Sequence, residues 1–424
     1  MRFEKTLMAS ALTAALVVPT AASADELSDL KAQMNELMNR IETLEAMERT
    51  EHSDPAHAGQ STRATGRPAV NGDGAADWKP TIISGNDKVR VSLSGHINRA
   101  VMAYDDGENS DVHHVDNENS NTRFRIIGEY DASDTFSVGS VIEVEFESNS
   151  SSDVFQNSRE SDHSENNFAQ RKFEIYFADK GWGKLSLGQG DTASNGTSEV
   201  DLSGTGLAGY SSVGDVGSRL RFYDKNSNGF VSDSTDLVVI SDGFTNMDGL
   251  SRQDRIRYDT PAIAGFTFSV SHAEDDGLDA AVRYKGDLGG LKVAGALAFA
   301  DNQSDSPIDN QVNGSISVAM DNGFNLTFAS GQQDRKRGSG DPQFYYTKLG
   351  YKMGASAYSV DYYSSDDVSA NGNEGTSMGF QYVRNITEWA TEAYFQLRQF
   401  EMEDNRSTDY DDIWHVMAGA RVKF

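Results

Sequence analysis

Apolar and polar residues alternate along most of the chain from Val89 to the carboxyl terminus. The pattern runs through RVSLSGHIN, NTRFRIIGEY, TFSVGSVIEVEFE, FTFSVS, LKVAGALAF and WATEAYFQL, among others. A period of two residues is typical of β-strands with one apolar and one polar face. We count about 16 to 18 such segments and find no helical periodicity among them. The pattern therefore predicts an all-β protein over residues 86–424.

Turn sequences between many of these segments indicate hairpins. Two of them are Asp321–Gly323 and Asp287–Gly290, and turns of this composition favour antiparallel pairing. Alternation alone fits a large soluble sandwich as well as a membrane barrel. The number of strands favours the barrel, because closing so many strands into one sheet leaves an interior too wide for side chains to fill. We therefore expect an antiparallel transmembrane β-barrel with a wet interior and an apolar outer face.

The last segment, Trp414–Phe424, has an apolar face that begins and ends with an aromatic residue. That face consists of Trp414, Val416, Ala418, Ala420, Val422 and Phe424. Strands that cross an outer membrane carry such an apolar band between two aromatic girdles. A terminal strand ending on Phe also resembles the insertion signal of bacterial outer-membrane barrels, which implies the barrel-assembly machinery as a partner through Trp414, Val422 and Phe424. The alternative is an edge strand of a soluble β-protein that ends on Phe by chance.

The first 24 residues have the composition of a secretory signal peptide. Arg2 and Lys5 precede an apolar run from Leu7 to Val18, and Ala22-Ser23-Ala24 follows as a small-x-small cleavage site. We expect the mature chain to begin near Asp25.

Residues 25–49 follow with a heptad pattern. The predicted seam consists of Leu27, Leu30, Met34, Leu37, Ile41 and Leu44. A coiled coil this short is marginal by itself, because nucleating a helix is costly. It is explained if a trimeric barrel already holds several copies together; a solitary helix packed on its own domain is the alternative.

A linker is predicted over residues 50–85. This stretch has few apolar residues and many Gly, Ala, Ser and Pro residues, a composition that does not form a packed core.

The overall composition is compatible with a barrel and incompatible with a helical membrane protein. The mean hydropathy is −0.55, with 39 Gly, 7 Pro and no Cys. No apolar run long enough for a membrane helix follows the amino terminus. A barrel keeps a low mean hydropathy because only alternate strand residues face lipid. The lack of Cys excludes thiol nucleophiles and Cys-type metal sites.

The formal net charge of −28 makes nucleic acid an unsuitable partner, since phosphate contacts need a basic surface. Much of the acid lies in Asp105–Asn121 and Glu401–Asp412. We interpret these runs as solvated loops rather than specific cation sites.

The sequence predicts neither an enzyme nor a cofactor nor a metal site. His96 lies beside Ser92 and Ser94, but one His among Ser-rich strands is expected by chance. Asp224–Gly229 has the spacing of a calcium loop, yet Thr235 stands where a bidentate Glu is needed.

From about Val89 to Phe424 the chain resembles the general porins of Gram-negative bacteria, most closely the alphaproteobacterial type. The stretches that carry the likeness are VSLSGHINRAVM, LGQGDTASNGTSEVDLSGTG, DGLSRQDRIRYDTP and DDIWHVMAGARVKF. The resemblance implies a 16-stranded barrel, a homotrimer, and a third loop folded inward as a constriction. The amino-terminal helix is not part of the general-porin barrel; it resembles the short periplasmic extension of some substrate-selective porins.

By position, residues 191–217 match the constriction loop, since they follow a strand and show no alternation. The acidic residues expected to face the pore are Asp191, Glu199, Asp201 and Asp215. The basic residues that parity turns inward on the wall are Arg123, Arg125, Lys172, Arg219, Arg221, Arg255 and Arg257. Such an arrangement would set a transverse field and ion selectivity, although some pairs are equally explained as salt bridges that pin the loop.

Together these features predict a porin of the Gram-negative outer membrane that lets small hydrophilic solutes and ions diffuse through a water-filled channel. We expect contact with outer-membrane lipid, a homotrimer with a periplasmic helix, and passage of small cations at least as well as anions. A substrate-selective channel of the same fold is the first alternative, and a trimeric surface adhesin or structural protein is the second.

Overall fold

The structure is a computed structural model, and it describes residues 82–85, 88–156, 168–226, 238–302, 306–338, 340–406 and 408–424. The predicted signal peptide, the predicted coiled-coil helix and residues 50–81 of the predicted linker lie outside the described residues. Among the described residues, no helix has the length and hydropathy of a membrane span.

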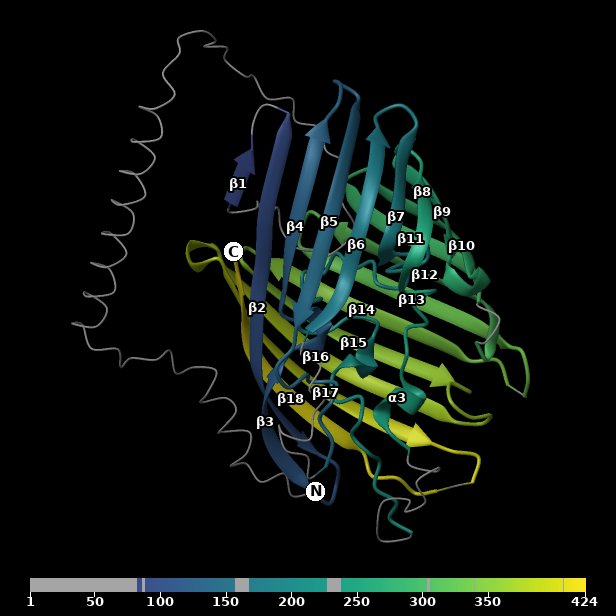
Figure 1. The fold of residues 1–424 in the computed structure, drawn as a ribbon. Coiled ribbons are helices and arrows are strands. Elements are labelled where there is room, and N and C mark those ends of the chain that lie inside the picture. The colour runs from purple at the N-terminus through teal and green to yellow at the C-terminus, as the bar shows by residue number, and fades with distance from the viewer. Residues whose placement is uncertain are drawn as a thin grey trace, which may run out of the picture. The chain divides into compact units, whose positions relative to one another are not determined.

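Strands make up nearly all of the regular secondary structure in the described residues, as the alternation predicts (Figure 1). The strands are β1 (Ile82–Gly85), β2 (Val89–Asp105), β3 (Ser110–Asp116), β4 (Arg123–Asp131), β5 (Phe136–Phe146), β6 (Phe168–Asp179), β7 (Gly183–Asp191), β8 (Arg252–Asp259), β9 (Phe266–Ala273), β10 (Leu278–Leu288), β11 (Leu291–Asp301), β12 (Ile308–Met320), β13 (Phe324–Arg335), β14 (Gln343–Met353), β15 (Ser356–Asp366), β16 (Glu374–Ile386), β17 (Thr391–Glu403) and β18 (Ile413–Lys423). Short helical turns are η1 (Glu118–Ser120), η3 (Val213–Asp215), α3 (Ile240–Gly243), η4 (Glu274–Asp276) and η5 (Thr387–Trp389).

The sheet closes on itself through β18 and β2. These strands pair antiparallel from Trp414 opposite Asp105 to Lys423 opposite His96, and β2 then pairs β4, which starts the series of antiparallel neighbours that leads back to β18. The ring thus contains 16 strands, β2 and β4–β18, so the barrel is closed and antiparallel.

Strands β1 and β3 lie beside β2 outside this count. β3 pairs the carboxyl-terminal half of β2, from Arg99 to Asp105. β1 pairs β2 from Arg90 to Leu93, next to the point where Phe424 ends against Gly95. The linker predicted to extend to residue 85 therefore ends earlier, because Ile82–Gly85 finds free backbone partners on β2 beyond the end of β18.

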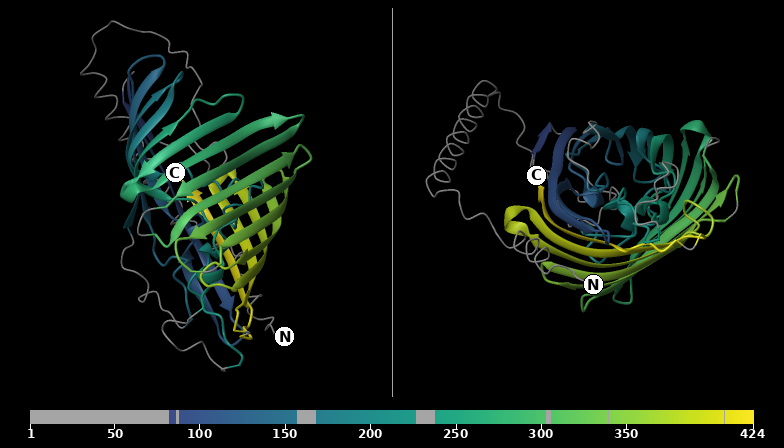
Figure 2. Two further views of the ribbon diagram at one scale, coloured as in Figure 1. Left: turned by 90° about the vertical axis from the view of Figure 1, so that its right-hand side faces the viewer. Right: turned by 90° about the horizontal axis from the view of Figure 1, so that it is seen from below.

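The two ends of the barrel differ in the length of their connections. At the end that holds the carboxyl terminus, β10 and β11 are joined by Gly289–Gly290, and β14 and β15 by Gly354–Ala355. The opposite end carries the long connections, including residues 192–251 between β7 and β8 (Figure 2). In outer-membrane barrels short turns face the periplasm and long loops face outside.

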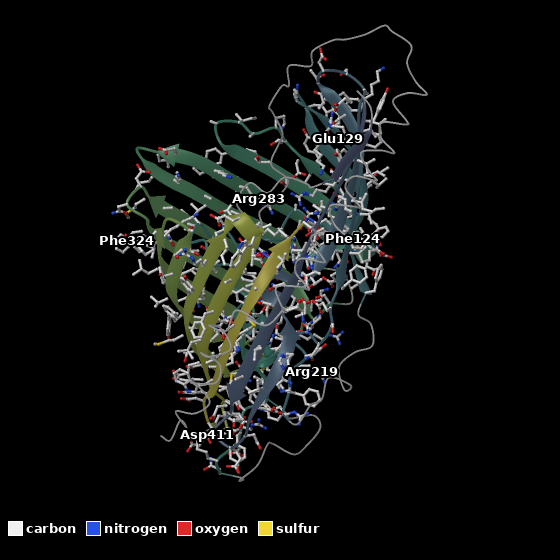
Figure 3. All side chains as sticks on the ribbon, turned by 90° about the vertical axis from the view of Figure 1, so that its left-hand side faces the viewer. Phe124, Glu129, Arg219, Arg283, Phe324 and Asp411 are labelled. Atoms are coloured by element: carbon white, nitrogen blue, oxygen red, sulfur yellow. The ribbon has the colours of Figure 1, made fainter. Side chains whose placement is uncertain are left out.

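The wall has an apolar outer face and a polar inner face. On β12, Val312 and Ile316 are 45% and 48% exposed, whereas Asn313, Ser315 and Ser317 are buried. Phe324 lies on the outer surface near a short turn and is 47% exposed (Figure 3). Apolar side chains exposed in rows on alternate positions are explained by contact with lipid.

The last strand has the alternation predicted for it. His415, Met417 and Arg421 are buried, whereas Val422 and Phe424 are 47% and 42% exposed. Phe424 exchanges two backbone hydrogen bonds with Gly95, of 2.9 and 3.0 Å. A Cβ on Gly95 would lie 2.6 Å from Cζ of Phe424, so a glycine is required beside the terminal ring.

The interior differs from the expected wet lumen in one region. A cluster of buried apolar residues joins the β7–β8 connection to the inner face of β13–β18 and β2. From the connection it includes Leu207, Leu220, Phe222, Ile240 and Phe244, and from the wall Met102, Phe344, Phe400, Ile413 and Met417. This part of the interior is dry because the connection is long enough to cover the apolar inward residues near the long-loop end.

Candidate functional site

The β7–β8 connection crosses the inner face of the wall, and hydroxyl side chains of the wall hold it there. Ser315 Oγ accepts a hydrogen bond from the Val200 amide at 2.9 Å and donates to the Thr197 carbonyl at 2.6 Å. Ser317 Oγ accepts from the Leu202 amide at 2.9 Å. These side chains satisfy the buried backbone groups that a neighbouring strand would otherwise satisfy.

The start of the connection is fixed by arginines of the wall. The side chains of Arg255 and Arg257 are only 3% and 4% exposed. Arg255 Nε donates to the Asp191 carbonyl at 2.9 Å, and Arg257 Nη1 donates to the Thr192 carbonyl at 2.7 Å. Arg283, which the sequence reasoning did not single out, donates to the carbonyls of Ala193 and Asn195 at 2.8 Å each. These guanidinium groups therefore bind the backbone of the connection.

Asp201 faces the wall. Its Oδ2 accepts from Nζ of Lys348 at 2.7 Å, and the Lys348 side chain is fully buried. The same ammonium donates to the Gly209 carbonyl at 2.6 Å and to Thr205 Oγ1 at 3.2 Å. Burial by itself would raise the pKa of Asp201, but Lys348 and the hydrogen bonds from Ser203 together more than offset it and hold that pKa below its ordinary value.

Lys348 belongs to a polar row that runs across neighbouring strands. Lys348 lies opposite Asp361, Asp361 opposite Gly379, and Gly379 opposite Arg398. Arg398 reaches across β16 to Asp361, with 2.8 Å between Nη2 and Oδ2 and both side chains fully buried. A Cβ on Gly379 would lie 2.5 Å from Nη2 of Arg398, so this position has to be glycine for the pair to form.

Two of the other predicted basic residues, Arg123 and Arg125, pair with one carboxylate on β5. Glu143 forms ion pairs with Arg125, with Arg123 at 3.7 Å and with Arg171 at 2.8 Å, and its side chain is 1% exposed. Lys172 forms an ion pair with Asp191 at the end of β7. Arg123, Arg125 and Lys172 are thus brought together, with Arg171 added.

Arg171 enters this cluster through a β-bulge. Glu143 lies opposite Lys172 and Val144 opposite Gln170, so Arg171 is skipped in the backbone register between β5 and β6. A bulge puts one extra residue into a strand and re-aims the side chains around it. Two consecutive residues, Arg171 and Lys172, therefore both face inward, which simple alternation cannot predict.

Asn121 bridges the arginines around Glu143 and two glutamates at the end of β5. Its Oδ1 accepts from Arg123 Nη2 at 2.7 Å and from Arg171 Nη1 at 3.2 Å. Its Nδ2 donates to Glu145 Oε2 and to Glu147 Oε1, both at 2.7 Å. Burial raises the pKa of Glu147 to about 8, and the nearby charge of Glu118 adds to this shift.

Glu199 and Asp215 lie on the connection close to Asp248, which the sequence reasoning missed. Glu199 Oε1 accepts from Asn246 Nδ2 at 2.9 Å, and Asp248 Oδ1 accepts from the Gly196 amide at 2.7 Å. Burial raises the pKa of Glu199 well above its ordinary value, and the charges of Asp248 and Asp215 raise it further. Burial also raises the pKa of Asp215 to about 7 and that of Asp248 to about 6.

Arg219 and Arg221 are not on a barrel strand, which corrects the prediction that they are inward-facing basic residues of the wall. They lie within the β7–β8 connection, where both guanidinium groups stack on the ring of Phe155 at 4.8 and 5.5 Å. Arg219 also lies 3.6 Å from a carboxylate oxygen of Asp153 and is placed toward the long-loop end (Figure 3). The short alternation around them comes from packing of the connection, with Leu220 and Phe222 in the apolar cluster.

Among the described residues, no group of three or more His, Asp or Glu side chains is arranged to hold a metal ion. The carboxylates that gather in the lumen contact arginine, lysine, amide and hydroxyl donors instead.

A closed barrel of 16 antiparallel strands with an apolar outer face and a charged interior is the architecture of an outer-membrane channel. Residues 11–405 match the family described as Gram-negative porin, and the chain belongs to that family. It is an outer-membrane porin, which forms a water-filled channel for passive diffusion of small hydrophilic solutes and ions.

Solved structures share the fold. The anion-selective porin from Comamonas acidovorans has 17% sequence identity and a TM-score of 0.55, and the match covers 80% of this chain and 100% of that one. OmpT, an outer membrane protein of Vibrio cholerae, has 13% identity and a TM-score of 0.50, and the match covers 81% of this chain and 99% of that one. No curated protein sequence matches the chain.

Proposed function

We propose that the β7–β8 connection is the constriction of the pore. Support comes from its anchoring: the Arg255, Arg257 and Arg283 guanidinium groups bind its start, and Lys348 binds its middle. It is longer than the predicted 191–217, since it continues to Ser251. A segment that crosses the inside of a barrel narrows its lumen. Because this segment is fixed at several points, it does not swing across the pore and close it.

The pore passes small cations at least as well as anions. The observation that carries this proposal is the contrast between the two charged sides. The basic cluster is matched by Glu143 and Asp191 in direct ion pairs, whereas Glu199, Asp215 and Asp248 lie together with hydrogen-bond donors that are largely neutral. Arg252 and Arg283 are the arginine charges that act on this group, so its three carboxylates outnumber them. Carboxylates in excess over nearby positive charge attract cations at close quarters when ionised.

The test is the reversal potential of single channels in planar bilayers across a potassium chloride gradient at pH 7.5. We expect a potential of zero or of the sign for potassium preference. A strong chloride preference would overturn the proposed selectivity, and an absence of stepwise conductance would overturn the channel itself.

A substrate-selective channel remains the second candidate. The predicted helix over residues 25–49 favours it, since a similar extension occurs in some selective porins. Current block by one solute at sub-millimolar concentration, with no block by other solutes of similar size, would support it. The adhesin alternative is set aside, because the family and the barrel define a channel.

The predicted assembly is also proposed. The chain is a homotrimer of the alphaproteobacterial general-porin type, with a periplasmic coiled coil along Leu27, Leu30, Met34, Leu37, Ile41 and Leu44. Phe424, with Trp414 and Val422, is recognised by the barrel-assembly machinery. Cross-linking in intact outer membranes should give trimers, and Leu37→Asp with Ile41→Asp should weaken them; a monomer in the membrane would contradict the proposal.

A further inference from the structure

Glu143 has an unusual position among the charges of the wall. It lies on β5, and its partners come from both neighbouring strands: Arg123 and Arg125 from β4, and Arg171 from β6. Its own side chain is 1% exposed, while those of Arg123, Arg125 and Arg171 are 11%, 28% and 11% exposed. The guanidinium groups therefore stand between the carboxylate and the lumen.

The bulge in β6 serves this arrangement. It turns Arg171 inward next to Lys172, and Arg171 then bonds Glu143 at 2.8 Å and Glu145 at 2.6 Å. Bulges commonly re-aim side chains beside functional sites. Without a carboxylate at position 143, guanidinium groups this close to one another would repel.

We propose that Glu143 is a selectivity-determining residue, which acts from within the wall by neutralising part of the basic cluster and holding its arginines in place. Ions in the pore do not touch Glu143. They experience the sum of its charge and the charges of the arginines in front of it, and this sum sets how strongly the wall attracts anions. The inference rests on the proposed constriction, since the cluster has this effect only where the pore is narrow.

The experiment compares neutralised variants by reversal potential in a potassium chloride gradient at low ionic strength, where screening is weak. Glu143→Gln removes one negative charge without changing the shape of the side chain. A unit charge about 8 Å from the path of an ion changes its partitioning by about twofold in water, so the chloride-to-potassium permeability ratio should rise by at least about twofold.

The matched control is Glu129→Gln on the same pair of strands. Glu129 also faces inward and pairs with Arg90, but it lies four residues from Arg125 toward the short-turn end, about 13 Å along the strand. It should change the permeability ratio much less. Arg171→Gln should shift the ratio toward potassium, and the double variant Glu143→Gln with Arg171→Gln should return close to the wild type.

The inference is overturned if conducting Glu143→Gln channels keep the wild-type reversal potential or shift no more than Glu129→Gln. If Glu143→Gln does not assemble, Arg171→Gln decides: no shift toward potassium would overturn the inference as well. Failure of the proposed function is distinct, because the wild-type protein would then form no channels.

Discussion

Charged residues inside this barrel have two different roles. Arg255, Arg257 and Lys348 are buried and bind the backbone or a carboxylate of the β7–β8 connection. Glu199 and Asp248 lie on the connection with amide donors from Asn246 and Gly196. The first group holds the connection against the wall. Under the proposed function, the second sets the charge that the connection presents to the pore.

The raised pKa values predict that selectivity depends on pH. Asp248, with a pKa of about 6, and Asp215, with a pKa of about 7, are largely neutral at pH 5 and charged at pH 8. Preference for potassium over chloride should therefore increase between pH 5 and 8. Reversal potentials measured at constant salt would test this, and the increase should be smaller in Asp215→Asn with Asp248→Asn.

The same groups link pH to the stability of the connection. A folded state that raises a carboxyl pKa binds the proton more tightly than the unfolded chain does, so this contribution is present at low pH and is lost as the pH rises through about 6 to 7. Arg252 and Arg283 lower the pKa of Asp248, and Glu118 raises that of Asp215. An unfolding temperature in detergent that does not fall between pH 5 and 8 would contradict this stability link, and a permeability ratio that is constant over the same range would contradict the predicted change in selectivity.

At the level of elements, the β7–β8 connection behaves as an inner layer of the wall. Its backbone bonds to Ser315 and Ser317, and its side chains contribute to the apolar cluster. Lys348 binds the middle of the connection through three hydrogen bonds, to Asp201, Thr205 and Gly209.

Lys348→Met should loosen this layer. Removing one partner of a buried ion pair leaves the other charge uncompensated, which costs on the order of 3–5 kcal/mol. We expect a lower unfolding temperature in detergent and more current noise in open channels. Lys292→Met, which removes an exposed lysine of β11, is the control and should resemble the wild type.

The double variant Lys348→Met with Asp201→Asn gives a second check. It removes both charges, so it should recover part of the lost stability. If Lys348→Met alone has wild-type stability and quiet channels, the ammonium does not hold the connection.

The sequence predicts the strands of this protein well and its irregular features poorly. Alternation identifies the wall because one face of each strand meets lipid. It fails at Arg171, where a bulge shifts the register. It also fails at Arg219 and Arg221, because the short alternation around them belongs to the β7–β8 connection and not to a wall strand. Asp201 was expected to face the pore, yet it bonds Lys348, and no local pattern tells which way a loop side chain points.

At the level of the whole molecule, closure of the barrel depends on the pairing of β18 with β2. The last backbone hydrogen bonds of that pairing join Phe424 to Gly95. The sequence predicts the importance of the terminal Phe424 from its position. It does not single out Gly95 as its partner, because the chain has 39 glycines and no local pattern marks this one.

Phe424→Ala should reduce the fraction of chains that reach the folded barrel. The ring lies on the outer face over Gly95, so its loss removes apolar contact at the seam. The fraction of heat-modifiable, folded protein in outer membranes measures this. Trp389→Ala, which removes a 65% exposed aromatic from a short turn, is the control, and equal yields from both variants would contradict the role of Phe424.

The apolar cluster between the connection and β13–β18 has a further consequence for transport. Because the cluster covers one arc of the interior, we expect a permeating ion to travel along the opposite arc, close to β4–β7. The pore is therefore off-centre in the barrel, and the number of strands in the wall does not determine the pore diameter. Anyone wishing to enlarge it would trim the inner layer rather than add strands.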